Sequence, residues 1–431
     1  MDLCSHYQVG DEQKPIDKRI RKRVQLQNDE MAGDALRVLG VAYGYTDSSE
    51  TALPSDLIWL GLIGMEDVIR PGMAELMAEF HQAGIDTVMI TGDQVATALS
   101  VGKRLGLSRN GDMRIIDSRE LEQASPDELK EIVKGTTVFA RVSPAHKLRI
   151  VQALQASGQV VAMTGDGIND GPALKAADIG VAMGKQGTDV ARSVAGVVLQ
   201  DDNMHTMITA VEQGRTIYGN IQKSLRFLLS SNLSEIQLML ASFAMGYGEA
   251  LNPMQLLWIN LVTDIFPALA LSMEPPERDV LKQAPRDPGQ PILGKDDIQK
   301  LMRESLTMTA GSMAVFLYSL SRYGVGAKAS TNTFMTLTVA QFLQSITSRS
   351  ESTSVLDRSR PSNPYLNLAI AGSLGVQALA VLLPPLRGLL RLTPIGPMDL
   401  AIILAGSVAP FVVNEGVKAS GITRQRRATL S

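Results

Sequence analysis

The sequence predicts a Rossmann-like α/β domain followed by an all-α bundle of six transmembrane helices. From residue 57 to residue 200, short β-branched runs alternate with stretches that carry apolar residues at three- and four-residue spacing, a pattern typical of parallel α/β sheets. From residue 225 onward, apolar runs of about 17–23 residues alternate with charged or proline-rich connectors. Runs of that length match the hydrocarbon core of a bilayer, which is roughly 30 Å thick.

Composition excludes several classes of protein. The net charge of −3 gives no reason to expect a nucleic-acid partner. The single cysteine, Cys4, excludes an internal disulfide framework and a metal site built from cysteines. The N-terminus is polar and charged, which argues against a signal peptide.

Residues 1–50 are interpreted as the remnant of a larger domain. Residues 11–28 are polar and charged, and the apolar run 35–43 predicts a buried strand interrupted by Arg37. A soluble domain does not normally begin with such an isolated half-element, so we expect the chain to be a fragment.

The α/β domain is expected over residues 51–212. Short apolar runs predict its strands at 57–63, 87–90, 137–139, 160–163, 179–181 and 196–199. Helices are predicted between several of these strands, at 72–83, 96–105 and 147–156. Residues 213–224 are expected to form a stalk that continues without a break into the first membrane span.

The membrane domain is expected over residues 225–431. Its six predicted spans are about 225–247, 254–273, 300–320, 333–348, 366–385 and 399–417. If the α/β domain is cytosolic, the connectors on its side and the C-terminal tail hold eleven lysines and arginines, whereas the outer connectors hold four. This excess favours a cytosolic N-terminal domain and C-terminus. The alternative is a set of buried helices in a large soluble protein.

The most specific motif, Thr164-Gly-Asp-Gly-Ile-Asn-Asp170, lies directly after the strand predicted at 160–163. Open α/β sheets place their ligands at the carboxyl ends of strands. Asp166 and Asp170 are four residues apart in a glycine-rich turn, so they can converge on one Mg²⁺, which prefers oxygen ligands and phosphate. Asn169 adds a neutral donor and acceptor. The alternative is a solvated acidic loop.

Two weaker motifs lie where a phosphate site needs them. Thr91-Gly92-Asp93 follows the strand predicted at 87–90, so its hydroxyl and backbone amides can hold a phosphoryl oxygen. Lys147 stands at the start of a predicted helix, where its ammonium can neutralise phosphate charge. A lone lysine is more often an ordinary surface residue.

These strings resemble the phosphorylation domain of P-type cation ATPases, which has a haloacid-dehalogenase-like fold. The matching strings are Thr91-Gly-Asp93, Ala140-Arg-Val-Ser-Pro-Ala-His-Lys147 and Thr164-Gly-Asp-Gly-Ile-Asn-Asp170. In the membrane part, Leu229-Ser-Ser-Asn-Leu-Ser-Glu235 and Leu256-Leu-Trp-Ile-Asn-Leu-Val-Thr-Asp264 resemble the calcium-pump subgroup. The similarity extends from about residue 30 to the end of the chain.

The resemblance implies a role for each matching residue of the phosphate site. Asp166 would bind Mg²⁺, and Asn169 and Asp170 would support the metal and the phosphoryl group. Thr91 and Lys147 would bind the transferred phosphoryl oxygens.

The resemblance also implies contacts with ATP. Asp67, Asp93 and Arg141 would lie near the ribose and phosphates of the nucleotide. Arg37 matches an arginine that contacts the ATP phosphates, although it can equally be an ordinary edge-strand arginine.

The aspartate that the family phosphorylates lies in Asp-Lys-Thr-Gly-Thr, and that string does not occur in this sequence. Asp17-Lys18 continues as Arg-Ile and is no substitute. The family's Thr-Gly-Glu motif does not occur either. We therefore expect the C-terminal part of a pump, inactive alone, with an N-terminal pump fragment as a partner that supplies the aspartate.

A cation site is predicted from polar residues inside the spans, where such groups are costly and usually functional. Asn232 and Glu235 are three residues apart and share a helix face. In the next span Asn260, Thr263 and Asp264 fall at i, i+3 and i+4, again on one face. Their carboxylate, amide and hydroxyl oxygens suit Ca²⁺.

Four further residues bear on that site. Asn252-Pro253 predicts the N-cap and first residue of the second span. Pro267 predicts a break just past Asp264, which would free carbonyls beside the site. Gln341 stands where the calcium-pump subgroup often has glutamate. Polar pairing between packed helices is the alternative interpretation of these side chains.

The sequence thus predicts part of an ATP-driven cation pump that transports Ca²⁺ and uses Mg²⁺ and ATP. We expect it to lie in a lipid bilayer, with a bacterial plasma membrane as the working hypothesis. The alternative is a non-catalytic membrane remnant or a regulatory cation-binding protein. A membrane-tethered phosphatase is disfavoured because that chemistry needs the same aspartate nucleophile.

Overall fold

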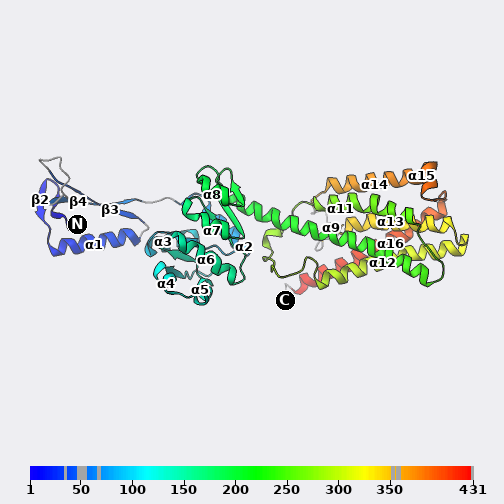
Figure 1. Cartoon of the computed structure of the whole chain (residues 1–431), viewed down its shortest axis with the longest axis horizontal. Coiled ribbons are helices and arrows are strands. Elements are labelled where there is room, and N and C mark those ends of the chain that lie inside the picture. The colour runs from blue at the N-terminus through cyan, green and yellow to red at the C-terminus, as the bar shows by residue number, and fades with distance from the viewer. Residues whose placement is uncertain (34–35, 46–55, 66–68, 351–354, 356–360, 429–431) are drawn as a thin grey trace. The chain divides into compact units, whose positions relative to one another are not determined.

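The computed structural model describes the chain of 431 residues apart from 34–35, 46–55, 66–68, 351–354, 356–360 and 429–431 (Figure 1). The chain divides into two compact units. The first holds residues 1–210 and 282–285, and the second holds residues 211–281 and 286–431.

The first unit begins with a mixed sheet in the order β2-β1-β4-β3, accompanied by helix α1. These elements are β1 (Cys4–Val9), β2 (Glu12–Pro15), α1 (Lys18–Gly33), β3 (Arg37–Tyr43) and β4 (Leu57–Met65). Strand β4 pairs in parallel with β1 and antiparallel with β3. The prediction that the run 57–63 lies in the sheet of the α/β domain is therefore wrong, because β1 and β3 take both of its edges.

Strand β3 is less buried than the sequence predicts. Its described residues are half-buried or exposed, and Leu39 is 50% exposed. Helix α1 contributes no buried residue to the interior of this region. The apolar run therefore corresponds to a strand that pairs within a partly exposed sheet, and not to a fully buried strand.

The α/β domain follows, with parallel pairing throughout. One sheet has the order β5-β7-β6 and the other β10-β9-β8. The strands are β5 (Met89–Ile90), β6 (Ile115–Asp117), β7 (Val138–Ala140), β8 (Ala162–Gly165), β9 (Ile179–Met183) and β10 (Val197–Leu199). The predicted α/β fold is confirmed, but the strands pair as two sheets instead of one. Ile90 packs against the hydrophobic clusters of both sheets, which places them side by side.

Short helices connect these strands. They are α2 (Met73–Gln82), α3 (Val95–Leu105), α4 (Ser118–Gln123), α5 (Pro126–Val133), α6 (Pro144–Ala156), the 3-10 turn η1 (Ile168–Asp170), α7 (Gly171–Ala176) and α8 (Asp189–Val194). Ser143 caps α6 by accepting the backbone N–H of His146, and Pro144 occupies the first position. This cap fixes the start of α6 three residues before Lys147.

The second unit is helical, and each of the six predicted spans falls on a helical stretch. The elements are α9 (His205–Ala244), α10 (Pro253–Trp258), the π-helix η2 (Ile259–Asp264), α11 (Ile265–Ser272), the 3-10 turn η3 (Val280–Lys282), α12 (Lys295–Tyr323), α13 (Ala327–Thr347), α14 (Pro364–Leu382), α15 (Pro384–Leu389) and α16 (Pro397–Ala428). The residues of the predicted stalk lie within α9, which runs for 40 residues without interruption.

Among the described residues, three helical stretches are long and apolar enough to cross a membrane: Pro253–Ser272, Pro364–Leu382 and Pro397–Ser420. Helices α9, α12 and α13 cover the other three predicted spans. Helix α13 contains many threonines, serines and glutamines, and these residue types lower its mean hydropathy. Their side chains are nevertheless buried in the bundle interior. The count of six spans therefore stays a prediction.

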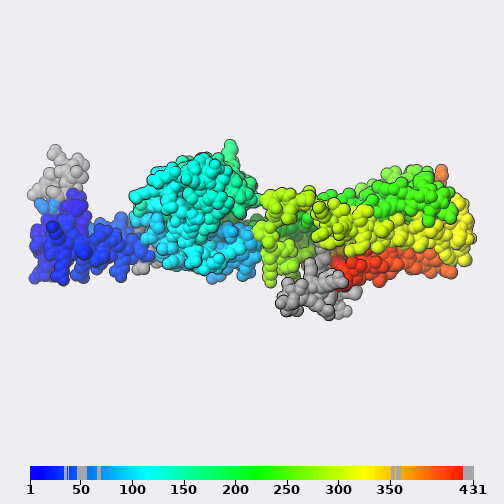
Figure 2. Space-filling view, turned by 90° about the horizontal axis from the view of Figure 1, so that it is seen from below, coloured from blue at the N-terminus to red at the C-terminus, as the bar shows by residue number. Residues whose placement is uncertain are grey.

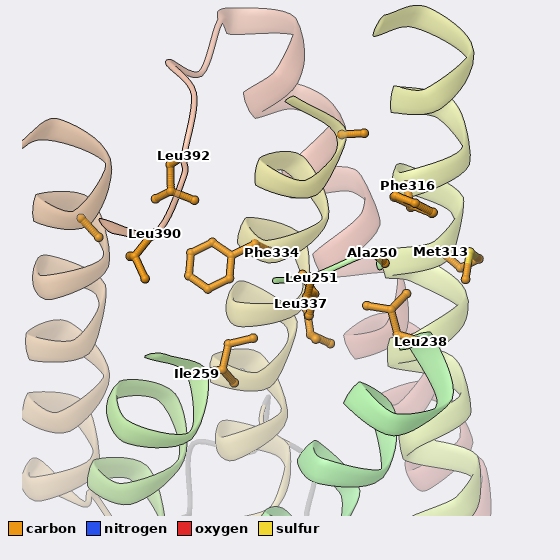
Figure 3. Close-up of a cluster of buried hydrophobic side chains, with 12 residues drawn as sticks. Leu238, Ala250, Leu251, Ile259, Met313, Phe316, Phe334, Leu337, Leu390 and Leu392 are labelled. Atoms are coloured by element: carbon orange, nitrogen blue, oxygen red, sulfur yellow. The ribbon is translucent and has the colours of Figure 1, made fainter. Parts of the chain in front are cut away.

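A hydrophobic cluster joins the helices of this unit. Leu238 of α9, Ile259 of η2, Phe316 of α12 and Phe334 of α13 all belong to it (Figure 3). Helix α16 (red) lies along α12 and α13 (yellow) in Figure 2. Gly311 and Gly406 permit this close approach, because a Cβ on Gly311 would lie 2.4 Å from the carbonyl oxygen of Gly406.

Candidate functional site

The phosphate motif forms a tight loop at the carboxyl end of β8. Asp170 is 6% exposed, and its Oδ1 accepts a hydrogen bond of 2.6 Å from Nζ of Lys147. Its Oδ2 accepts the backbone N–H of Gly167 at 3.2 Å. A Cβ on Gly165 would lie 2.5 Å from Cβ of Asp170, so only glycine fits beside this carboxylate.

The Lys147–Asp170 ion pair joins two parts of the α/β domain. Lys147 lies on α6, directly after β7, whereas Asp170 ends the turn that follows β8. The side chains are 19% and 9% exposed, so the pair is largely shielded from water. The structure therefore brings these two predicted residues together at the carboxyl ends of strands from both sheets.

Asp166 and Asp170 differ in what they contact. Asp166 and Asn169 are exposed, and the Asp166 carboxylate has no hydrogen bond within the described residues. Among all the residues that the structure describes, no group of three or more His, Cys, Asp or Glu side chains could hold a metal ion. Mg²⁺ is commonly bound through one or two carboxylates plus substrate phosphates, and a free exposed Asp166 fits that mode.

The Thr91-Gly92-Asp93 loop follows β5. The Thr91 hydroxyl donates to Oδ2 of Asp93 at 2.7 Å and accepts the Asp93 backbone N–H at 3.1 Å. The backbone N–H groups of Arg141 and Val142 donate to the carbonyls of Asp93 and Thr91. These bonds tie the loop to the end of β7, in the same sheet from which the chain enters α6 and reaches Lys147.

Arg141 occupies a left-handed backbone conformation with φ 56°. Its guanidinium lies 3.7 Å from the Asp117 carboxylate. The backbone N–H of Arg119, with smaller contributions from the Ser118 hydroxyl and Arg141, lowers the pKa of Asp117. Arg141 thus stands beside a charged carboxylate while its own side chain stays exposed.

Two further residues were predicted to contact ATP. Asp67 falls outside the described residues. Arg37 begins β3, where its backbone pairs with Met65.

The cation site draws on three helical elements of the second unit. Nδ2 of Asn232, on α9, lies 3.5 Å from Oδ2 of Asp264, at the end of η2. Nε2 of Gln341, on α13, donates to Oε1 of Glu235 at 3.0 Å. Glu235, Asp264 and Gln341 are 5% exposed or less. The structure thus gathers Asn232, Glu235, Asp264 and Gln341 from helices far apart in the sequence.

Several buried oxygen atoms at this site have no hydrogen-bond partner among the described residues. They are Oγ1 of Thr263, Oδ1 of Asp264, Oε1 of Gln341 and Oγ of Ser231. Buried polar groups are normally paired, so these oxygens are available to accept a further partner. Ser231, one helical turn before Glu235, was not predicted, because an isolated serine in a span gives no distinctive signal.

Asn260, predicted on one face with Thr263 and Asp264, differs from them in burial. Asn260 is exposed, and its Nδ2 donates to the Leu256 carbonyl of its own helix at 3.0 Å. Thr263 and Asp264 are buried. Residues 259–264, which carry all three side chains, are wound as a π-helix.

The predicted start of this span is confirmed, but the predicted break is wrong. Asn252 caps α10, and Pro253 is its first residue. The chain does not break at Pro267; instead residues 259–264 wind as η2, and α11 continues through Pro267. A π-turn accommodates the missing N–H of proline without ending the helix.

Comparisons with known proteins match both the α/β part and the helical part of the chain. Residues 7–178 match the family model for haloacid dehalogenase-like hydrolases, and residues 248–420 match the model for the C-terminus of cation transporting ATPases. A calcium-transporting ATPase of Bacillus subtilis is 41% identical over 402 residues, covering 92% of this chain and 44% of the relative. Human calcium-transporting ATPase type 2C member 1 is 34% identical over 423 residues, covering 98% of this chain and 45% of the relative. The chain thus spans about half the length of the curated relatives it matches.

Proposed function

We propose that this chain, which belongs to the P-type cation-transporting ATPases of the calcium-pump type, carries the phosphate-handling and cation-binding parts of an ATP-driven Ca²⁺ pump. The observation that carries the proposal is the joint presence of two sites on one chain. A lysine–aspartate pair lies at the strand ends of an α/β domain, and a buried cluster with two carboxylates lies in a helical bundle.

The phosphate site would act on an acyl phosphate formed from ATP. Thr91 and the Lys147 ammonium would hold the phosphoryl oxygens, and Asp170 would keep Lys147 in place. Asp166 would hold Mg²⁺, which neutralises phosphoryl charge when bound. Asn169, exposed beside Asp166, is available to the same group.

The phosphoryl acceptor must come from outside these residues, because the family's Asp-Lys-Thr-Gly-Thr string does not occur in them. We expect the purified chain to form no acid-stable phosphoenzyme with radiolabelled ATP. Adding a segment that contains the acceptor aspartate, taken from the Bacillus relative, should restore labelling of that segment. Acid gel electrophoresis measures both results.

Two outcomes of that experiment would decide against the proposal. A labelled band from the chain alone, removed by substituting one of its own aspartates, would contradict an external acceptor. Absence of labelling after the segment has demonstrably bound to the chain would favour the non-catalytic alternative.

The cation site fits a hard divalent ion. Carboxylate, amide and hydroxyl oxygens converge there, and Ca²⁺ takes six to eight oxygen ligands. The two carboxylates would balance the charge of one such ion. Asn260 faces outward, where a further helix could complete the coordination.

Helix α9 offers a route for coupling the two sites. It carries Asn232 and Glu235 and extends through the predicted stalk without interruption. Within the second unit, Asn220 donates to the Glu274 carbonyl at 2.6 Å, and Lys223 pairs with Glu277 at 2.8 Å. A movement of the stalk would therefore carry the connector after α11, and with it the π-helix.

The orientation proposed from the charge distribution places the connector 286–294 in the cytosol and the α12–α13 turn outside. We expect an impermeant maleimide to label Ser321→Cys in intact bacteria but not Gln290→Cys, in a Cys4→Ser background. Both positions are exposed in the structure, so burial does not explain a difference. Labelling of position 290 without position 321 would reverse the orientation.

A further inference from the structure

Two polar side chains of α14 contact the π-helical segment η2. Ser373 Oγ donates to the Val262 carbonyl at 2.9 Å, in the middle of η2. Gln377 Oε1 accepts Nε1–H of Trp258 at 2.8 Å, one residue before η2 begins. Ser373 and Gln377 are four residues apart, so they lie on one face of α14.

The Val262 carbonyl needs an external donor for a chemical reason. In a π-turn the carbonyl of residue i is served by the N–H of residue i+5. Five residues after Val262 stands Pro267, which has no N–H. Because a buried carbonyl without a donor is costly, the Ser373 hydroxyl replaces the missing amide.

Gln377 is held from both ends of its amide group. Its Oε1 receives the Trp258 indole, and its Nε2 donates to Sδ of Met335 on α13 at 3.1 Å. The side chain is 1% exposed. Its orientation is therefore fixed, and it anchors the residue that precedes η2 to two neighbouring helices.

We propose that Ser373 and Gln377 are positioning residues for the cation site, acting through η2 on Thr263 and Asp264. Among the described residues, neither side chain forms a hydrogen bond with a predicted ligand. They hold the backbone that carries Thr263 and Asp264, whose Oγ1 and Oδ1 atoms are buried without a hydrogen-bond partner. This inference rests on the proposed Ca²⁺ function for its ligand, but the contacts themselves do not depend on that function.

The first measurement is hydrogen exchange in the metal-free chain, reconstituted in nanodiscs. Ser373→Ala should speed the exchange of amides at 259–266 by about threefold to tenfold, the loss expected for one neutral hydrogen bond. Ser373→Thr retains a hydroxyl and should restore slow exchange. Ser345→Ala is the matched control, because this buried hydroxyl bonds only the Phe342 carbonyl of its own helix.

The second measurement is a Ca²⁺ titration followed by Trp258 emission in a Trp59→Phe background, which leaves Trp258 as the one tryptophan. Gln377→Leu should shift the metal-free emission, because the indole loses its acceptor. Ser373→Ala and Gln377→Leu should each raise the half-saturating Ca²⁺ concentration about threefold to tenfold, while Ser345→Ala leaves it unchanged.

The two measurements together distinguish failure of the positioning role from failure of the proposed Ca²⁺ function. Faster exchange with an unchanged half-saturating Ca²⁺ concentration would show that α14 supports the fold only, and would overturn the positioning role. Unchanged exchange in Ser373→Ala would overturn it as well. If the parent chain shows no saturable response to millimolar Ca²⁺, the Ca²⁺ function is contradicted, and exchange alone decides whether α14 holds η2.

Discussion

Asp264→Asn is expected to weaken Ca²⁺ binding at least about 100-fold and to abolish Ca²⁺-dependent phosphorylation in the reassembled pump, since ligand charge sets calcium affinity. Asp264 is 3% exposed, and its Oδ1 has no protein partner among the described residues. Removing its charge halves the negative charge that the site offers to a divalent ion. Equilibrium binding of radioactive Ca²⁺ to the chain, with and without the complementing segment, measures the effect.

Two comparisons separate ligand loss from misfolding. Gln341→Ala removes a neutral amide and should weaken binding by about tenfold or less, because no charge is lost. Asp264→Asn should not lower the metal-free stability of the chain, because a buried carboxylate is costlier than an amide of the same shape. Ca²⁺ transport that survives Asp264→Asn, or turnover with Mn²⁺ or Na⁺ in place of Ca²⁺, would remove the calcium assignment.

The sequence predicts the phosphate loop well because its chemistry is local. The glycine-rich turn after β8 places Asp170 beside Gly165 through contacts within six residues of chain. The different contacts of Asp166 and Asp170 were not predictable from the sequence. They depend on Lys147, which lies on α6 after a strand of the other sheet. The assignment of the run 57–63 failed for a related reason, since pairing partners of a strand lie far away in sequence.

The cation site was also only partly predictable from the sequence, because its residues come from helices that are far apart in the chain. The residue types in the spans predict a hard-ion site, but helical spacing alone does not predict that Asn260 is exposed while Thr263 and Asp264 are buried. The π-winding of η2 depends on Pro267 together with a hydroxyl that α14 supplies more than 100 residues later. The roles of Ser231 and Ser373 can therefore be inferred only from the packing of the helices, and not from the sequence.

Lys147→Met is expected to destabilise the α/β domain by about 3–5 kcal/mol, because it leaves the Asp170 carboxylate buried without its partner. Both side chains of the pair are less than one fifth exposed. Hydrogen exchange of the peptides covering β8 and β9, measured in the full chain, reports the local free energy of opening. The matched control is Lys134→Met, which breaks an ion pair with Glu131 of similar length, 2.7 Å, whose side chains are 53% and 73% exposed. That exposed pair should contribute below about 1 kcal/mol.

The double variant Lys147→Met/Asp170→Asn identifies the cause. Removing both charges eliminates the unpaired carboxylate, so most of the lost stability should return, whereas phosphoenzyme formation in the reassembled pump should not. Recovery of stability without recovery of phosphorylation would mean that the Lys147–Asp170 pair serves the phosphoryl group in addition to the fold. If Lys147→Met lowered the free energy of opening by no more than Lys134→Met does, water would screen the Lys147–Asp170 pair in solution. The burial of the pair would then contribute nothing to the stability of the domain.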